Sequence, residues 1–145
     1  MILALPFFAD TAFWIALFRH RDQYHRESRA WQDYIVRSGA ILVTTEAICW
    51  EWMNAMSGTT TRRVAAQAYQ RVRLDPQIQV VPFSKELSTG ALRLFADRSD
   101  KDWSLTDCLS FVIMGSRNIQ KALTADHHFE QAGFRPVLSD TPPVP

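Results

Sequence analysis

Residues 121–129 read KALTADHHF: a short apolar run, then an aspartate, then residues that can begin a helix. The apolar part has strand composition, and Asp126 stands where that strand would end. The same succession recurs in PFFADTAFW, whose apolar run ends at Asp10, and in ILVTTEAICW, whose run ends at Glu46. Strands that alternate with helices in this way predict an α/β fold with a mainly parallel sheet covered on both faces.

Apolar runs and helical periodicity divide the rest of the chain in the same manner. We expect four to five strands, at Ile2–Ala9, Ala40–Thr44, Ile78–Phe83, Lys121–Thr124 and, as a possible fifth, Pro136–Leu138. We expect helices at residues 22–37, 46–56, 61–74, 85–96 and 105–116, and a further helix directly after the first strand.

Length and charge limit the possible functions. The 145 residues, 47% of them hydrophobic, suffice for one compact core, so we expect a single domain at 1–140 and a loose tail at 141–145. With a net charge of +1, no strong overall field attracts nucleic acid or a membrane. Arginine pairs such as Arg62 and Arg63 could hold an anionic partner locally, although they are equally typical of solvated helix faces.

The cysteines and the N-terminal run indicate where the protein acts. Cys49 and Cys108 lie far apart in apolar stretches, a pattern typical of reduced, buried thiols in a cytosolic protein. The run 1–18 lacks a basic start, and Pro6 and Asp10 interrupt it, so we interpret it as a core strand and a helix rather than a signal peptide. We therefore expect a soluble, cytoplasmic protein with no membrane partner.

Four acids are expected to meet at one edge of the sheet. Ligands of an open parallel sheet bind beyond the carboxyl ends of the strands, where Asp10, Glu46 and Asp126 stand. Asp107 lies in the first turn of the helix that leads into the fourth strand, so it can face the same edge. Each acid could be no more than a helix cap, and residues 104–107 match a capping box. Several carboxylates together repel one another, however, and a bound cation removes this conflict.

The ligand types indicate which cation is expected. Carboxylates with room for water suit Mg²⁺ or Mn²⁺, whereas zinc prefers histidine or cysteine in tetrahedral spacing. His127 and His128 are adjacent, so on a helix they point about 100° apart and do not easily share one ion. A site built from carboxylates is therefore favoured, and either histidine could still contact a phosphate.

The order of these motifs resembles a known family. Asp10-Thr11 after the first strand, Glu46 after the second, DWSLTDCLSF at 102–111 and TADHHFEQAGF at 124–134 are similar to the PIN-domain ribonucleases, and most of all to VapC-type toxins of bacterial toxin-antitoxin modules. The resemblance covers nearly the whole chain, and the two longer motifs are its specific part.

The resemblance implies a fold, an activity and partners. It implies a three-layer α/β/α sandwich and a Mg²⁺- or Mn²⁺-dependent endoribonuclease with catalytic residues Asp10, Glu46, Asp107 and Asp126. It also implies a homodimer that acts on RNA and is inhibited by a small cognate antitoxin.

The chemistry expected at this site is metal-assisted hydrolysis of a phosphodiester. Asp10, Asp107 and Asp126 would hold the ion, and Glu46 would complete its coordination or orient the attacking water. The hydroxyls of Thr11, Ser104 and Thr106 could bond the carboxylates from outside, or they could cap helices. This route leaves a 5′-phosphate and a 3′-hydroxyl.

Three other points stay open in the sequence. Asp100 and Asp102 precede the Ser104 motif and are interpreted as loop residues, with Asp102 a candidate outer member of the site. Trp50 and Trp52 face different sides of one helix, so one could be exposed at an antitoxin groove or a dimer contact. The alternative to an enzyme is a non-catalytic PIN-like module that binds RNA or protein.

A phosphatase that forms an aspartyl-phosphate is not expected. It would need a second acid two residues after Asp10, and this chain has Ala12 there.

Overall fold

The computed structural model describes residues 4–144. Its centre is a sheet of five parallel strands in the order β3-β2-β1-β4-β5. The strands are β1 (Phe7–Ala9), β2 (Leu42–Thr45), β3 (Ile78–Val81), β4 (Lys121–Leu123) and β5 (Arg135–Pro136). Each predicted strand is present and is shorter than expected. Residues 2 and 3 of the first predicted strand lie outside the described part.

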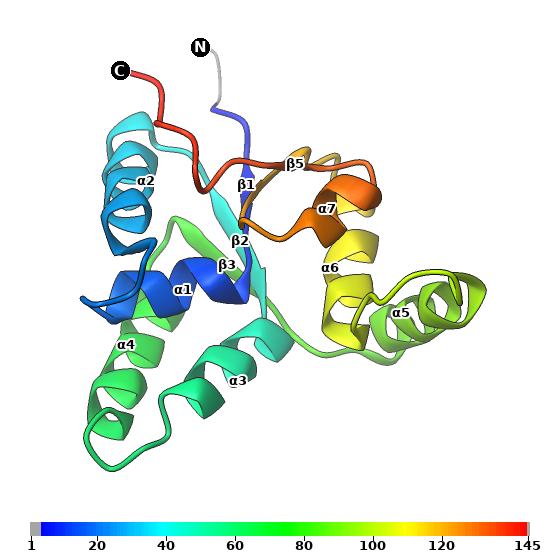
Figure 1. The fold of residues 1–145 in the computed structure, drawn as a ribbon, viewed down its shortest axis with the longest axis horizontal. Helices are drawn as coiled ribbons and strands as arrows, with labels where there is room; N and C mark the ends of the chain where they lie inside the picture. The colour runs from blue at the N-terminus through cyan, green and yellow to red at the C-terminus, as the bar shows by residue number, and fades with distance from the viewer. Residues whose placement is uncertain (1–3, 145) are drawn as a thin grey trace.

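Seven helices cover this sheet in the described part of the chain. They are α1 (Thr11–Phe18), α2 (His25–Ser38), α3 (Glu46–Ala55), α4 (Arg62–Leu74), α5 (Lys85–Asp97), α6 (Leu105–Ser116) and α7 (His127–Gln131). In Figure 1, α1, α2 and α4 lie on one side of the strands and α5, α6 and α7 on the other. The predicted three-layer α/β/α arrangement is thus confirmed, and the helix bounds agree with the predicted ones to within three residues.

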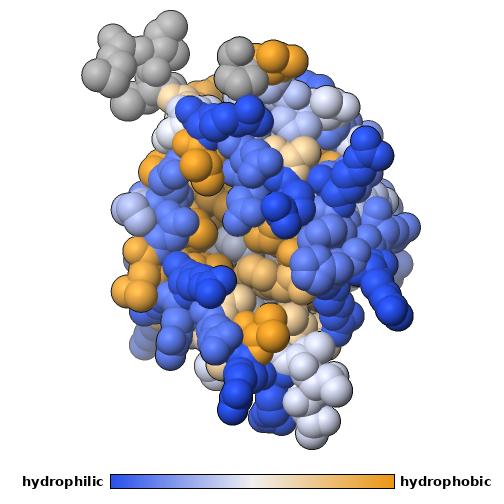
Figure 2. All heavy atoms as spheres, turned by 90° about the vertical axis from the view of Figure 1, so that its left-hand side faces the viewer, coloured by the Kyte–Doolittle hydropathy of each residue, from blue (hydrophilic) through white to orange (hydrophobic). Residues whose placement is uncertain are grey.

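The outer helices turn most of their charged side chains to solvent. Figure 2 views the face on the left of Figure 1, where hydrophilic residues cover most of the surface and apolar residues show between them. On α2 the buried residues are Ser28, Trp31 and Ile35, a spacing of three to four that leaves the charged positions outside. No helix in residues 4–144 combines the length and the apolar character needed to cross a bilayer.

Aromatic side chains fill the core on both faces of the sheet. Trp52 is fully buried against Trp14 and Phe18, while Trp50 on the same helix is 60% exposed, as the helical spacing predicts. On the opposite face, Phe129 packs edge-on against Phe111, with 5.0 Å between ring centroids. Phe129 thereby anchors the short helix α7 to the core. The division into a domain at 1–140 and a tail at 141–145 stays a prediction.

Candidate active site

The pairing of β1 with β4 places two of the predicted acids at the ends of neighbouring strands. Asp10 follows β1, and Asp126 lies three residues after the end of the adjacent strand β4. The buried hydroxyl of Thr124 joins them: it donates to Asp10 Oδ2 at 2.8 Å and accepts from the backbone N–H of Asp126 at 3.1 Å. A single side chain therefore fixes the distance between the carboxyl ends of two strands.

Asp10 has the position of a helix cap without the contact of one. It is the N-cap residue of α1, yet its side chain makes no cap hydrogen bond. It is only 9% exposed, and burial raises its pKa to about 7, helped by the charges of Asp107 and Glu51 and opposed by hydrogen bonds from the Thr11 backbone and Thr124. Capping of a helix thus does not explain this carboxyl, and a nearby cation would stabilise its charged form.

Asp107 reaches the same place from the first turn of α6. Its backbone N–H donates to Ser104 Oγ at 2.9 Å, and its Oδ2 accepts from the Ser104 backbone N–H at 3.1 Å, so the predicted capping box is confirmed. Burial raises the pKa of Asp107, and the charge of Asp126 raises it further, while the hydrogen bond from Ser104 and the contact with His128 lower it. The residue therefore caps its helix and belongs to the acidic cluster as well.

The two histidines of the opening motif differ in their surroundings. His128 Nδ1 lies 3.3 Å from Asp107 Oδ2 and 3.4 Å from Asp126 Oδ1, and its side chain is 21% exposed. His127 Nδ1 lies 3.6 Å from Asp126 Oδ1, and its side chain is 71% exposed. Both approach Asp126 because that residue is the N-cap of α7, so its carboxylate lies over the first turn of the helix.

The cap position brings both histidines near one carboxylate, although they were not expected to share an ion easily. One ligand atom from each of Asp126, His127 and His128 lies within 4.8 Å of the other two. The carboxylate set still fits a cation better, because three sequence neighbours at one helix end do not account for the buried Asp10 carboxyl.

Glu46 points away from these acids. Its Oε1 accepts from the backbone N–H of Phe83 at 2.7 Å, and its Oε2 lies 3.9 Å from Arg73 Nη1. The charges that act on Asp10 are those of Asp107 and Glu51, and Glu46 is not among them. The structure does not bring Glu46 to the cluster; its carboxylate instead holds the connection between β3 and α5. Its catalytic role stays a prediction.

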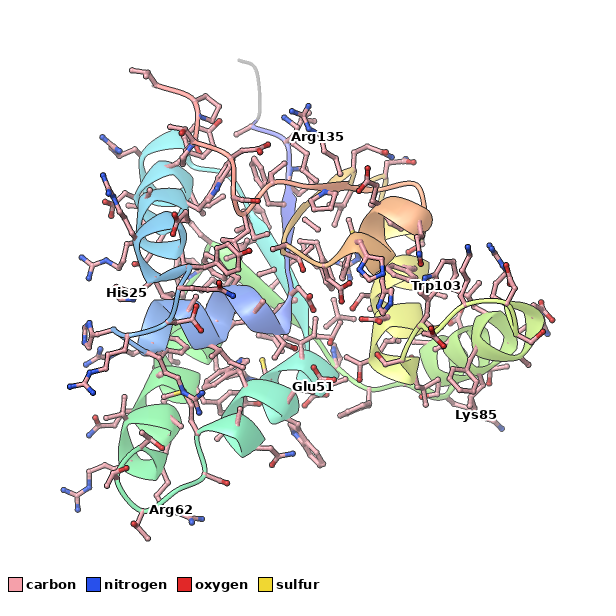
Figure 3. All side chains as sticks on the ribbon, viewed as in Figure 1. His25, Glu51, Arg62, Lys85, Trp103 and Arg135 are labelled. Carbon is pink, nitrogen blue, oxygen red and sulfur yellow. The ribbon has the colours of Figure 1, made fainter. Side chains whose placement is uncertain are left out.

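Glu51 is the acid that the sequence reasoning missed. Its Oε2 accepts from the Thr11 hydroxyl at 2.5 Å, and its charge helps to raise the pKa of Asp10. Figure 3 labels it on α3, on the part of that helix that approaches α1. The expected acids lie at strand ends or in the first turn of a helix, whereas Glu51 stands in the middle of α3. No local pattern indicates its contact with Thr11, which depends on how α3 packs on α1.

The remaining predicted residues take other positions. The Thr11 hydroxyl bonds Glu51, whereas only its backbone bonds Asp10, and Thr106 lines a groove between α3, α5 and α6. Asp100 is exposed and is paired with Arg98 at 2.9 Å, and Asp102 is exposed in the same loop. Neither loop acid is among the charges that act on Asp10 or Asp107.

Comparisons with known proteins identify the family of the chain. The family model described as the PIN domain matches residues 7–135. The 23S rRNA-specific endonuclease VapC20 of Mycobacterium tuberculosis is 29% identical over 131 residues, which cover 88% of this chain and 94% of that protein.

Solved structures give the same result. The crystal structure of the Mycobacterium tuberculosis VapC20, described as a sarcin-ricin loop cleaving toxin, matches with a TM-score of 0.78 at 26% identity and covers 92% of this chain and 98% of that one. FitAcB of Neisseria gonorrhoeae shares the fold, with a TM-score of 0.63 at 14% identity over 91% of this chain and 95% of that one. The family model spans most of the chain, and the chain belongs to the PIN domain family.

Proposed function

We propose that this protein is a metal-dependent endoribonuclease and the toxin of a toxin-antitoxin pair. The observation that carries the proposal is the buried Asp10 carboxyl, which caps no helix and lies in an acidic cluster with a pKa of about 7. The likeness to VapC20, an RNA endonuclease described as a toxin, supports RNA as the substrate and an antitoxin as a partner. The free, buried cysteines are consistent with the expected cytoplasmic location.

The residues at the sheet edge fit a divalent cation that prefers oxygen ligands. Asp10, Asp107 and Asp126 would hold Mg²⁺ or Mn²⁺, and Glu51 is placed to complete the acidic set through its contact with Thr11. Such an ion supplies Lewis-acid stabilisation of the phosphate and makes water a stronger nucleophile at neutral pH.

The chain's own residues organise this chemistry. Thr124 orients Asp10 by donating to Oδ2. The capping box holds Asp107 through two hydrogen bonds to Ser104. Because a nucleophile from water does not require the RNA 2′-hydroxyl, we expect products with a 5′-phosphate and a 3′-hydroxyl.

We also propose that a second copy of this chain packs over the groove between α3, α5 and α6. The groove has a volume of about 280 Å³ and carries no charged side chain; it is lined by Ala47, Trp50, Phe83, Ser88, Ala91, Leu92, Thr106, Leu105 and Leu109. Trp50 and Phe83 are both more than half exposed and pack edge-on on its wall. An exposed tryptophan in an apolar groove is typical of a protein contact.

The nuclease is tested by cleavage of mixed structured and single-stranded RNAs with Mn²⁺ or Mg²⁺. Asp10→Asn keeps the side-chain shape but removes a ligand charge, so we expect the rate to fall by at least about a hundredfold, more than the loss of an outer contact costs. Asp140→Asn, which changes an acid elsewhere on the surface, should cleave normally. Full activity of Asp10→Asn would remove the metal-site assignment, and clear RNA binding with no cleavage would favour the non-catalytic module.

Glu46 and Glu51 form a matched pair on one helix. Because Glu51 lies with the cluster and Glu46 bonds Phe83, we expect Glu51→Gln to lower the cleavage rate at least tenfold more than Glu46→Gln. Both variants keep the length of the side chain, so circular dichroism should show the same fold. A larger loss in Glu46→Gln would restore the role that the sequence predicts for that residue.

The raised pKa of Asp10 predicts a pH-dependent stability of the ion-free protein. The folded state keeps the proton up to a pKa of about 7, whereas the unfolded chain releases it near the ordinary aspartate pKa of 3.8. The folded state binds more protons in this window, so the contribution of Asp10 to the free energy of unfolding is largest below it and is lost as pH rises through 7. At about 1.4 kcal/mol for each pKa unit, the effect amounts to a few kcal/mol at most.

Urea unfolding in EDTA at pH 5 and pH 8 measures this effect. Asp10→Asn removes the titrating carboxyl, so the variant should lose less stability than the wild-type protein between these two pH values. Equal losses in the two proteins would show that Asp10 titrates normally.

Light scattering of the purified protein tests the proposed dimer. We expect Trp50→Glu to lower the mass to that of a monomer, because a charge in the groove would be buried without a partner. Leu74→Glu changes a side chain that is 83% exposed and lies outside the groove, and it should leave the dimer intact. A wild-type protein that is monomeric at high concentration would contradict the proposal.

A further inference from the structure

We infer that His128 is a positioning residue that donates from its ring Nδ1 to Asp107 and from its backbone N–H to Asp126, and so fixes the relative position of these two ligands. The inference rests on the proposed metal site and assigns to His128 the placement of two of its ligands. Nδ1 lies 3.3 Å from Asp107 Oδ2 and 3.4 Å from Asp126 Oδ1.

The contacts of His128 join two separate elements. Asp107 belongs to α6, whereas Asp126 precedes α7. Strand β4 separates these two helices along the chain. The backbone N–H of His128 donates to Asp126 Oδ1 at 2.9 Å, and the ring Nδ1 makes its hydrogen bond with Asp107 Oδ2. One residue therefore holds both carboxylates, one through its main chain and one through its ring.

A shared donor is needed here because the two acids repel each other. The charge of Asp126 is one of the causes that raise the pKa of Asp107, after burial. A donor between two carboxylates reduces this repulsion and holds the oxygens at a defined separation before any ion arrives. The ring itself is held, since the His128 side chain is only 21% exposed.

His127 offers a matched control one residue away. It is also a histidine in the first turn of α7, but its ring lies near Asp126 alone and is largely exposed. If His128 acts through the two carboxylates, then His128→Ala should weaken ion binding and His127→Ala should not. If instead both rings bind the ion directly with Asp126, the two changes should cost about the same.

Two isosteric variants identify the atom. The amide nitrogen of asparagine takes roughly the place of histidine Nδ1, and that of glutamine takes roughly the place of Nε2. Donation from Nδ1 therefore predicts that His128→Asn keeps most of the ion affinity and that His128→Gln does not. If His128 only filled space, His128→Asn and His128→Gln should have the same ion affinity.

The test is the Mn²⁺ affinity of the full chain at pH 8, measured by calorimetry, with thermal unfolding in EDTA as the check on folding. We expect His128→Ala to bind Mn²⁺ about 10–100-fold more weakly, as is typical when an outer partner of a metal ligand is lost. His128→Asn should bind within about threefold of the wild-type protein, and so should His127→Ala.

Three results would overturn the inference. These are unchanged affinity in His128→Ala while Asp10→Asn loses affinity, equal losses in His127→Ala and His128→Ala, and a better rescue by glutamine than by asparagine. A wild-type protein that binds no Mn²⁺ would remove the proposed function instead. The position of the His128 proton, observed by ¹⁵N NMR in EDTA, would still test the inference: a proton on Nδ1 supports it, and a neutral ring protonated only on Nε2 contradicts it.

Discussion

The parallel pairing of β1 with β4 is the constraint on which the site depends. β1 is the central strand of the sheet. Its pairing with β4 joins two segments that lie far apart in the sequence, with Phe8 opposite Ala122 and Ala9 opposite Leu123. Once this pairing forms, Thr124 meets Asp10, and Asp126 follows at the start of α7. A slip by one residue would turn Thr124 to the other face of the sheet and separate the acids.

This arrangement costs stability in the absence of an ion. Asp10 is buried beside other acids, and Asp107 is partly desolvated as well, so the folded protein without a cation holds carboxyls in surroundings that disfavour their charge. The large aromatic core on both faces of the sheet offsets this cost. Residues that lower the stability of the fold are expected at functional sites, and here the buried carboxyls gather at one edge of the sheet.

The sequence predicts most of this fold because its apolar runs and helical patterns alternate clearly. It also predicts Asp10, Asp107 and Asp126, since each follows a strand or opens a helix at the carboxyl edge. It does not predict Glu51, because the contact with Thr11 depends on how α3 packs on α1, a tertiary relation that no local pattern records. The same limit applies to Glu46, whose position at a strand end is as predicted while its carboxylate turns to Phe83. For Trp50 and Trp52, local periodicity is sufficient, and the expected difference in exposure is observed.

The brevity of α7 has a consequence for the dynamics of the site. A helix of five residues is too short to be stable on its own, so α7 depends on its tertiary contacts, chiefly the burial of Phe129 against Phe111 and Phe8. Asp10 and Asp107, by contrast, belong to longer helices packed on the core. The position of Asp126 in the acidic cluster therefore depends on the packing of one aromatic side chain more than the positions of Asp10 and Asp107 do. Substitution of the Phe129 ring would act on the site by weakening the attachment of α7, and with it the placement of Asp126.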